Sequence, residues 1–334
     1  LKELESADRA TFVSACGTGK TITLQAIASS LAKNNRIVAF FPSLILIDQT
    51  IKEWSEQFQG NFRAIAVCSD ETVGGADDEV RVDDSELEEK GVEVTRDPVR
   101  LAEILEEPVN KPLVVFSTYH SSERVAEAQK ISKISFDILV SDEAHYLANM
   151  SKSNRGKVVL DKDQILSDKR VFATATPKII TIKNTDDNRI ITSMDDETLF
   201  GKQAYNLDLR TAIKRDLLCD YVIYVAHVSE EEIEYIVNKD MEDLKDSDKR
   251  MALGLAAYKR MQESLKVKRS ISYFSSKARA RAFAKSAGKN VDVITGELSA
   301  SQREPKLKLL KEVGGNIANV RCLTEGVDLP SLDA

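Results

Sequence analysis

The sequence has few of the residues that build disulfide frameworks or zinc sites. Its 334 residues include four cysteines and three histidines, and Cys16, Cys68, Cys219 and Cys322 lie far apart with no CxxC pair. A disulfide scaffold or a zinc knuckle requires closer spacing of its sulfur and nitrogen atoms. We therefore expect buried or incidental thiols and a reducing, cytoplasmic location.

Long apolar runs and a secretory leader are also missing. No apolar run approaches the ~18 residues that span a bilayer, so no membrane partner is expected. Residues 1–5 lack the basic start and apolar stretch of a signal peptide. Because the first residue is Leu1 rather than Met, we expect the sequence to be a fragment of a longer protein.

Neither sign of charge dominates the chain. The 47 lysines and arginines against 54 aspartates and glutamates give a net charge of -7. This excludes a protein that is basic throughout, although it allows a local basic groove for nucleic acid. With 42% hydrophobic and 30% charged residues, the chain has the composition of a folded globular protein. Its length favours two domains.

Short apolar segments alternate with amphipathic ones along most of the sequence. Strands are predicted at 36–41, 64–68, 113–116, 136–140 and 170–173, and helices at 21–33 and 44–58. This alternation predicts an α/β fold, with mostly parallel sheets covered by helices. We place one domain at 1–215 and an incomplete second one at 216–334, with strands at 222–225, 270–274, 291–294 and 317–323 and helices at 230–265, 277–287 and 301–313.

The composition changes sharply between about residues 69 and 90. Acidic residues there face only Arg81 and Lys90, and Gly74-Gly75 adds flexibility. We interpret this segment as a solvated acidic insertion. An acidic mimic of nucleic acid is the alternative.

The first chemical motif is a glycine turn between a short strand predicted to end at 13–15 and the helix predicted at 21–33. It consists of Ala15, Cys16, Gly17, Thr18, Gly19, Lys20 and Thr21. Glycines let backbone N–H groups turn toward a phosphate chain, and the following helix N-terminus adds its dipole. Lys20 would neutralise the β- and γ-phosphates of ATP, and the Thr21 hydroxyl would bind Mg²⁺. Ala15 departs from the glycine of the P-loop pattern, so a plain glycine turn with a surface lysine is the alternative.

The second motif, Asp142-Glu143-Ala144-His145, directly follows the predicted strand at 136–140. Carboxylates at the C-terminal end of a buried parallel strand lie where open α/β sheets bind ligands. Asp142 would hold Mg²⁺ through water, and Glu143 would orient and deprotonate the attacking water. Taken alone, Asp142 could be a helix N-cap. Together with the glycine turn, the motif predicts one magnesium–ATP site.

Several segments resemble, in order, the motifs of superfamily-2 helicases and translocases. The glycine turn resembles motif I, 142–145 motif II, and Thr174-Ala175-Thr176-Pro177 motif III. Further segments resemble motif Ia (Pro42-Ser43-Leu44 with Gln49-Thr50), the strand-end Thr motif (Phe116-Ser117-Thr118-Tyr119), motif IV with its following segment (272–276 and Thr295-Gly296) and motif V (321–330). Segments 116–119, 173–177 and 193–201 resemble restriction-enzyme translocases of type III and ISP. The spelling DEAH does not imply a DEAH-type RNA helicase.

The resemblance implies two RecA-like domains of the P-loop NTPase class, with ATP between them. It implies that Gly326 and Asp328 of the second domain close over the nucleotide bound at 16–21. It also implies that His145, Thr174 and Thr176 couple the state of the phosphates to the grip on nucleic acid. Expected contacts to the nucleic-acid backbone are Pro42, Ser43, Gln49, Thr118, Ser276, Gly296 and Thr324.

Other residues have two interpretations. Arg269, Lys277, Arg279, Arg281 and Lys285 form either a nucleic-acid contact or an exposed helix face. The single tryptophan, Trp54, is expected in the core rather than stacked on a base.

The function predicted from these motifs is a DNA helicase or translocase driven by Mg-ATP, which contacts the backbone of duplex DNA in restriction or phage defence. An RNA helicase is one alternative, and a regulatory module that does not step is another, although intact Lys20 and Glu143 argue against the latter. Any nuclease or methyltransferase would lie elsewhere in the parent protein or on a partner. The adenine-reading motif and motif VI fall outside the sequence, so we expect the fragment to hydrolyse ATP poorly and its parent to be active.

Overall fold

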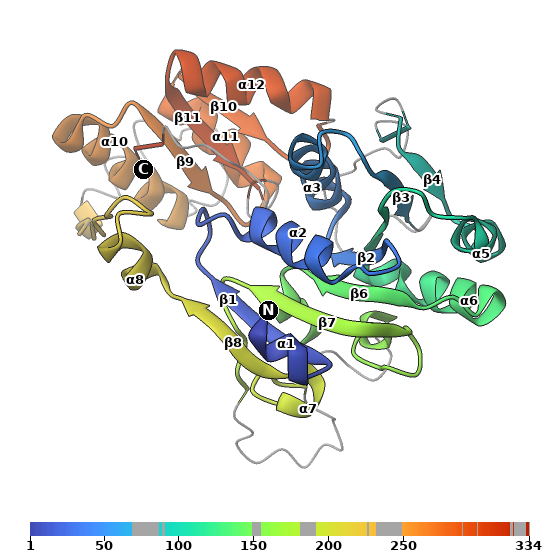
Figure 1. Cartoon of the computed structure of the whole chain (residues 1–334). Helices are drawn as coiled ribbons and strands as arrows, with labels where there is room; N and C mark the ends of the chain where they lie inside the picture. Colours follow the sequence, from blue (N-terminus) through green and yellow to red (C-terminus); the bar gives the residue numbers. More distant parts are fainter. Residues whose placement is uncertain are drawn as a thin grey trace, which may run out of the picture. The chain divides into compact units, whose positions relative to one another are not determined.

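The protein divides into two compact units. A computed structural model describes residues 1–68, 87–88, 91–148, 155–180, 192–225, 227–231, 249–288, 290–298, 300–320, 323 and 332–333. The first unit comprises residues 1–70 and 84–220, and the second contains residues 221–334. Each unit has a sheet of its own (Figure 1).

The first unit is built on an eight-stranded sheet in the order β4-β3-β5-β2-β6-β7-β1-β8. All of its neighbouring strands pair in parallel. The strands are β1 (Arg9–Ser14), β2 (Arg36–Phe41), β3 (Arg63–Val67), β4 (Glu93–Thr95), β5 (Leu113–Thr118), β6 (Phe136–Ser141), β7 (Ser167–Thr174) and β8 (Lys202–Leu207).

Helices cover both faces of this sheet. One hydrophobic cluster contains side chains from α1 (Lys2–Ser6), α2 (Lys20–Leu31) and α3 (Leu44–Gln57). A second cluster contains side chains from α5 (Pro98–Glu106), α6 (Ser122–Ser132) and α7 (Glu197–Phe200). Shorter elements connect the layers: α8 (Leu209–Lys214) and the 3₁₀ turns η1 (Tyr119–Ser121), η2 (Ala144–Leu147) and η3 (Arg155–Val159).

Strand β2 is apolar from Ile37 to Phe41, and both of its faces are buried. In β2, Ile37, Ala39 and Phe41 pack into the cluster with α2 and α3. Val38 and Phe40 alternate with them and pack into the cluster with α5 and α6. Side chains of a strand point alternately to opposite faces, so a strand between two helical layers has no solvent-facing positions.

The strand order brings separate parts of the sequence together at one edge. Strand β7 lies between β6 and β1, and all three run parallel. The loop after β1, the acidic residues after β6 and Thr174 at the end of β7 therefore meet at the carboxyl edge of the sheet.

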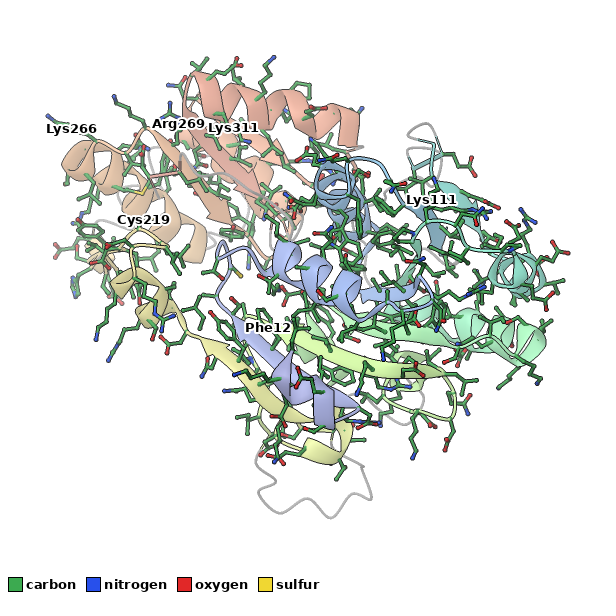
Figure 2. The ribbon with its side chains drawn as sticks, viewed as in Figure 1. Phe12, Lys111, Cys219, Lys266, Arg269 and Lys311 are labelled. Atoms are coloured by element: carbon green, nitrogen blue, oxygen red, sulfur yellow. The ribbon has the colours of Figure 1, made fainter. Side chains whose placement is uncertain are left out.

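The second unit has a parallel three-stranded sheet in the order β10-β11-β9. Its elements are α10 (Lys249–Leu265), β9 (Arg269–Tyr273), α11 (Lys277–Ala287), β10 (Val291–Ile294), α12 (Ala300–Glu312) and β11 (Gly315–Asn319). Side chains of α10 and α11 share one cluster with β11, and Leu310 of α12 belongs to another. Arg269 donates from Nε to the Lys311 carbonyl at 3.1 Å, which ties β9 to α12 (Figure 2).

The predicted fold class is confirmed, and several local predictions are wrong. Residues 222–225 form no strand: Val222, Ile223, Tyr224 and Val225 are 71%, 75%, 66% and 89% exposed. Their strand propensity has no effect without a neighbouring strand to pair with, and no described strand pairs with them. Ile22, one of the apolar positions of the amphipathic helix predicted at 21–33, is 47% exposed rather than buried in the core.

Other predictions fall partly outside the described residues. The structure describes only residues 87–88 of the acidic insertion, and they are helical. Of the long helix expected at 230–265, it describes residues 230–231 and 249–265, which are also helical. Leu87 is fully buried in the α2–α3 cluster. Trp54 is 1% exposed and lies in the core, as expected. No helix among the described residues has the length and apolar character needed to cross a bilayer.

A buried carboxylate fixes the turn between α2 and β2. Asp137 of β6 is 3% exposed. It accepts the backbone N–H of Asn34 at 3.0 Å, the Asn34 side-chain amide at 2.6 Å and the backbone N–H of Arg36 at 2.9 Å. It therefore supplies the acceptors that this turn lacks in its own backbone.

We predict that Asp137→Ala lowers the free energy of unfolding by about 2–3 kcal/mol, because it leaves these donors without an acceptor. Asp168→Ala, at an exposed position of β7, is the matched control and should cost less than about 0.5 kcal/mol. Urea denaturation followed by circular dichroism measures both. Equal stability of the two variants would contradict the assigned role of Asp137.

Candidate active site

The loop between β1 and α2 is a tight turn that hydrogen bonds of Thr18 stabilise. Gly17 and Gly19 have φ angles of +77° and +81°, which other residues rarely adopt. The Thr18 hydroxyl lies 2.7 Å from the Ser14 hydroxyl and donates to the Ala15 carbonyl at 2.6 Å. Gly19 is the N-cap of α2 and offers no side-chain acceptor to the first turn. The N–H groups of that turn are thus available to an anion.

Lys20 joins this loop to the acidic motif. Its ammonium nitrogen lies 2.9 Å from Asp142 Oδ1 and also pairs with Glu143 Oε1. The side chains of Lys20, Asp142 and Glu143 are only 9%, 7% and 15% exposed. Burial lowers the pKa of Lys20, but the two carboxylates outweigh it and hold that pKa above its usual value. Burial raises the pKa of Asp142, although Lys20 opposes it.

Hydrogen bonds hold the backbone of the acidic motif around Asp142 and Glu143. The Asp142 N–H donates to the Phe40 carbonyl at 2.9 Å, and the Glu143 N–H donates to Asp142 Oδ1 at 2.8 Å. The Asp142 carbonyl accepts from the Tyr119 hydroxyl at 2.6 Å. Glu143 itself has a φ of +50°, a left-handed conformation that is unfavourable for a residue with a side chain.

A polar chain runs from Glu143 to the end of β7. His145 Nδ1 lies 2.9 Å from the Thr174 hydroxyl and 3.2 Å from Glu143 Oε2. The Thr174 hydroxyl also contacts Glu143 Oε2 at 3.4 Å and accepts the Thr176 N–H at 3.1 Å. Burial alone would raise the pKa of Glu143, but the hydrogen bond with His145 and the charge of Lys20 lower it to about 2. Glu143 is therefore an anion at neutral pH.

The predicted nucleic-acid contacts of the first unit follow two paired strands. Phe41 at the end of β2 is in register with Thr118 at the end of β5, so Pro42 and Ser43 follow directly beside Thr118. Ser43 caps α3 by accepting the Leu46 N–H at 3.5 Å. Gln49 bonds Glu53 within α3 at 3.0 Å. Thr118 is 8% exposed and its hydroxyl donates to Ser121 at 3.0 Å.

In the second unit, Ser276 caps α11 by accepting the Arg279 N–H at 3.4 Å, and Gly296 lies buried just after β10. Thr324, Gly326 and Asp328 lie outside the described residues. Cys16 is exposed on the phosphate loop. The roles assigned to all these residues remain predictions.

Two contacts of the site were not predicted from the sequence. Tyr119 bonds the Asp142 carbonyl, and Leu218 lies against the loop, with its Cδ2 3.2 Å from where a Cβ on Gly17 would stand. The position of Tyr119, one residue after the strand-end Thr118, was a signal that it would lie near the acidic motif. Nothing in the sequence pattern indicates the contact of Leu218.

The residues at this edge fit a magnesium–triphosphate. The glycine loop and the α2 N-terminus offer N–H groups, Lys20 offers a cation, and Thr21 and Asp142 offer oxygen atoms. Mg²⁺ commonly binds proteins through one or two such oxygens, and takes phosphate oxygens and water for the rest. The chemistry of the site therefore suits a bound nucleoside triphosphate.

The parallel sheet and the motifs at its carboxyl edge define a helicase-type RecA-like fold. The family described as "Type III restriction enzyme, res subunit" matches residues 1–179. The chain belongs to this ResIII family, which confirms the resemblance drawn from its motifs.

Solved structures support the same fold. The ATP-dependent Type ISP restriction-modification enzyme LlaBIII, bound to DNA, has a TM-score of 0.79 and 24% identity, over 99% of this chain and 24% of that one. The Mycobacterium smegmatis helicase Lhr, bound to ssDNA and AMP-PNP, has a TM-score of 0.54 and 12% identity, over 99% of this chain and 40% of that one. The chain thus spans about a quarter of the length of LlaBIII. No curated protein gives a match.

We predict that Lys20→Met destabilises the protein more at pH 8 than at pH 5.5. Without the ammonium group, burial and mutual repulsion raise the pKa of Asp142 and Glu143 above their unfolded values. Such groups destabilise the folded state above their raised pKa, and this penalty disappears as they become protonated. The expected loss at pH 8 is about 3 kcal/mol.

Unfolding in urea at the two pH values measures this difference. Lys52→Met, at an exposed position of α3, is the control and should show no pH-dependent loss. A loss for Lys20→Met that is the same at both pH values would argue against the buried ion pair.

Proposed function

We propose that this chain is the motor part of a nucleic-acid-dependent ATPase that translocates along duplex DNA. The observation that carries the proposal is the pairing of Lys20 with both Asp142 and Glu143. It joins a phosphate-binding loop to a metal-binding carboxylate and a water-activating one. Membership of the ResIII family and the likeness in fold to a DNA-bound restriction enzyme support DNA as the polymer.

In the proposed reaction, the N–H groups of 16–21 hold the phosphates, and Lys20 leaves the carboxylates to bind the β- and γ-phosphate oxygens. Thr21 and, through water, Asp142 would hold Mg²⁺, which would neutralise charge that develops on the phosphates. Glu143 orients the attacking water and accepts its proton. With Lys20 on the phosphates, one of the charges that lower the pKa of Glu143 is withdrawn, so Glu143 becomes a better base.

The chain from Glu143 through His145 and Thr174 to Thr176 supports a coupling role for motif III. Cleavage of the γ-phosphate changes the charge around Glu143, and this hydrogen-bonded chain carries the change to the end of β7. Pro42, Ser43 and Thr118, which follow the paired strands β2 and β5, contact the DNA backbone in this proposal. Any nuclease or methyltransferase activity would lie elsewhere in the parent protein or on a partner.

Trp54 offers a built-in reporter of nucleotide binding. It is the only tryptophan, and its indole N–H donates to the Thr21 carbonyl at 3.3 Å. We predict that Mg-ATP changes the fluorescence of Trp54, and that Lys20→Ala abolishes this response whereas Lys52→Ala preserves it. Absence of both a fluorescence response and binding of labelled ATP in equilibrium dialysis would refute the nucleotide site.

ATP turnover in the presence of duplex DNA, single-stranded DNA or RNA identifies the polymer. Turnover is measured for this chain and for a longer protein that contains it, and we expect the largest stimulation by duplex DNA. Stimulation by RNA alone would favour an RNA helicase. Turnover that no polymer changes would favour a regulatory module.

We predict that Thr174→Val removes the stimulation by DNA and leaves the affinity for Mg-ATP within about twofold, because it deletes the hydroxyl shared by His145, Glu143 and Thr176 and preserves the shape of the side chain. Thr11→Val is the matched control, since Thr11 is also buried and its hydroxyl donates to the Phe200 carbonyl at 3.0 Å, its one hydrogen-bond partner in the described part of the chain. Equal loss of stimulation in both variants would contradict a specific coupling role.

A further inference from the structure

Tyr119 is a buried phenol that the proposed mechanism does not use. It is 2% exposed, and its ring stacks on Phe40 with centroids 6.4 Å apart and an angle of 12° between the planes. Its hydroxyl donates to the Asp142 carbonyl at 2.6 Å. Because β2 lies between β5 and β6, Tyr119 reaches from the end of β5 across β2 to the residue that follows β6.

Hydrogen bonds fix both polar groups of the peptide that joins Asp142 to Glu143. The carbonyl of the Asp142–Glu143 peptide accepts from Tyr119, and its N–H donates to Asp142 Oδ1 at 2.8 Å. A flip of this peptide would change ψ of Asp142 and φ of Glu143 together. It would release Glu143 from its unfavourable φ of +50°. The hydrogen bond from Tyr119 therefore opposes a flip that the backbone itself favours.

The flip would also move the Glu143 carboxylate. In its present conformation Glu143 reaches Lys20 through Oε1 and His145 through Oε2. Both contacts depend on the direction in which its Cβ leaves the backbone, which φ sets. Strained backbone of this kind persists only where surrounding contacts hold it, and such sites are commonly functional.

Packing alone does not explain the hydroxyl of Tyr119. A phenylalanine would fill the same space against Phe40, so what the oxygen adds is hydrogen bonding, including the bond to the Asp142 carbonyl at 2.6 Å. Burial raises the pKa of Tyr119 well above its usual value, and the negative charge of Asp142 adds to this. The phenol therefore remains a hydrogen-bond donor over the whole working range of pH.

Tyr119 is also tied to a predicted DNA contact. It directly follows Thr118, whose hydroxyl donates to Ser121 at the other end of the same 3₁₀ turn. A displacement of this turn moves the phenol along with Thr118. The turn thus connects the predicted nucleic-acid contact to the backbone of the acidic motif through one side chain.

We propose that Tyr119 is a positioning residue that holds the Asp142–Glu143 peptide so that the Glu143 carboxylate faces the phosphate site, and that it does so from the turn that carries Thr118. This inference rests on the proposed ATPase function. It assigns the alignment of the Glu143 carboxylate to Tyr119. The binding of nucleotide is assigned to the glycine loop and Lys20 instead.

The test is Tyr119→Phe, with Tyr205→Phe as the matched control. Tyr205 stacks on Phe12 of β1 with centroids 4.9 Å apart, and its hydroxyl makes no hydrogen bond among the described residues. Fluorescence of Trp54 gives the affinity for Mg-ADP and for Mg-ADP with aluminium fluoride, which mimics the transition state of phosphoryl transfer. Turnover with and without duplex DNA gives kcat and KM, and thermal unfolding gives Tm.

For Tyr119→Phe we expect unchanged affinity for Mg-ADP and unchanged KM. We expect three quantities to fall on the order of tenfold or more: kcat, the stimulation of turnover by DNA, and the ratio of affinities for Mg-ADP with and without aluminium fluoride. The reason is that a small misplacement of a catalytic group greatly slows the reaction. Tyr205→Phe should match the unsubstituted protein in every measurement.

Two results would overturn the proposal. If Tyr119→Phe matches the unsubstituted protein in kcat and in the aluminium fluoride preference, the hydroxyl positions nothing. If it weakens Mg-ADP and the aluminium fluoride complex equally, together with a lower Tm, its role is structural only. An unsubstituted protein that binds no magnesium nucleotide would refute the proposed function itself, which is a different outcome from either.

Discussion

The ammonium group of Lys20 is the interaction on which the site depends. Two carboxylates on consecutive residues, Asp142 and Glu143, lie almost out of contact with water. Such a pair would repel and become protonated without a cation between them. Lys20 reaches them only because α2 starts at the same edge of the sheet where β6 ends. The electrostatic balance of the site is thus a consequence of the parallel strand order.

Much of this arrangement could be predicted from the sequence, because each motif follows an apolar strand. Parallel strands place their carboxyl ends at one edge, which was enough to expect Lys20 near Asp142. The insertion of β7 between β1 and β6 could not be read from local patterns, since strand order is set by packing of the whole sheet. Thr174 entered the prediction only through the family resemblance, and this intervening strand is the reason it lies beside His145.

Sequence reasoning missed the features that depend on a neighbouring strand or side chain from another part of the chain. Residues 222–225 have the composition of a strand, but composition cannot supply a neighbour, and the segment is exposed. Short β4 and the polar edge strand β8, whose first five residues are exposed, lack the continuous apolar run by which central strands were recognised. Tyr119 appeared as part of a strand-end motif, and its bond to Asp142 spans a strand that separates them.

The resting site has a charge balance that suits a regulated hydrolase. With Lys20 and His145 beside it, Glu143 has a pKa of about 2, which makes it a weak base. Phosphate groups would compete with both carboxylates for the same ammonium group, because they carry more negative charge. Under the proposed function, the arrival of the triphosphate itself strengthens the base that activates the attacking water. His145 and Thr174 contact Glu143 through its other carboxylate oxygen, Oε2. Because Thr174 ends β7, a displacement of the end of this strand would also change the basicity of Glu143.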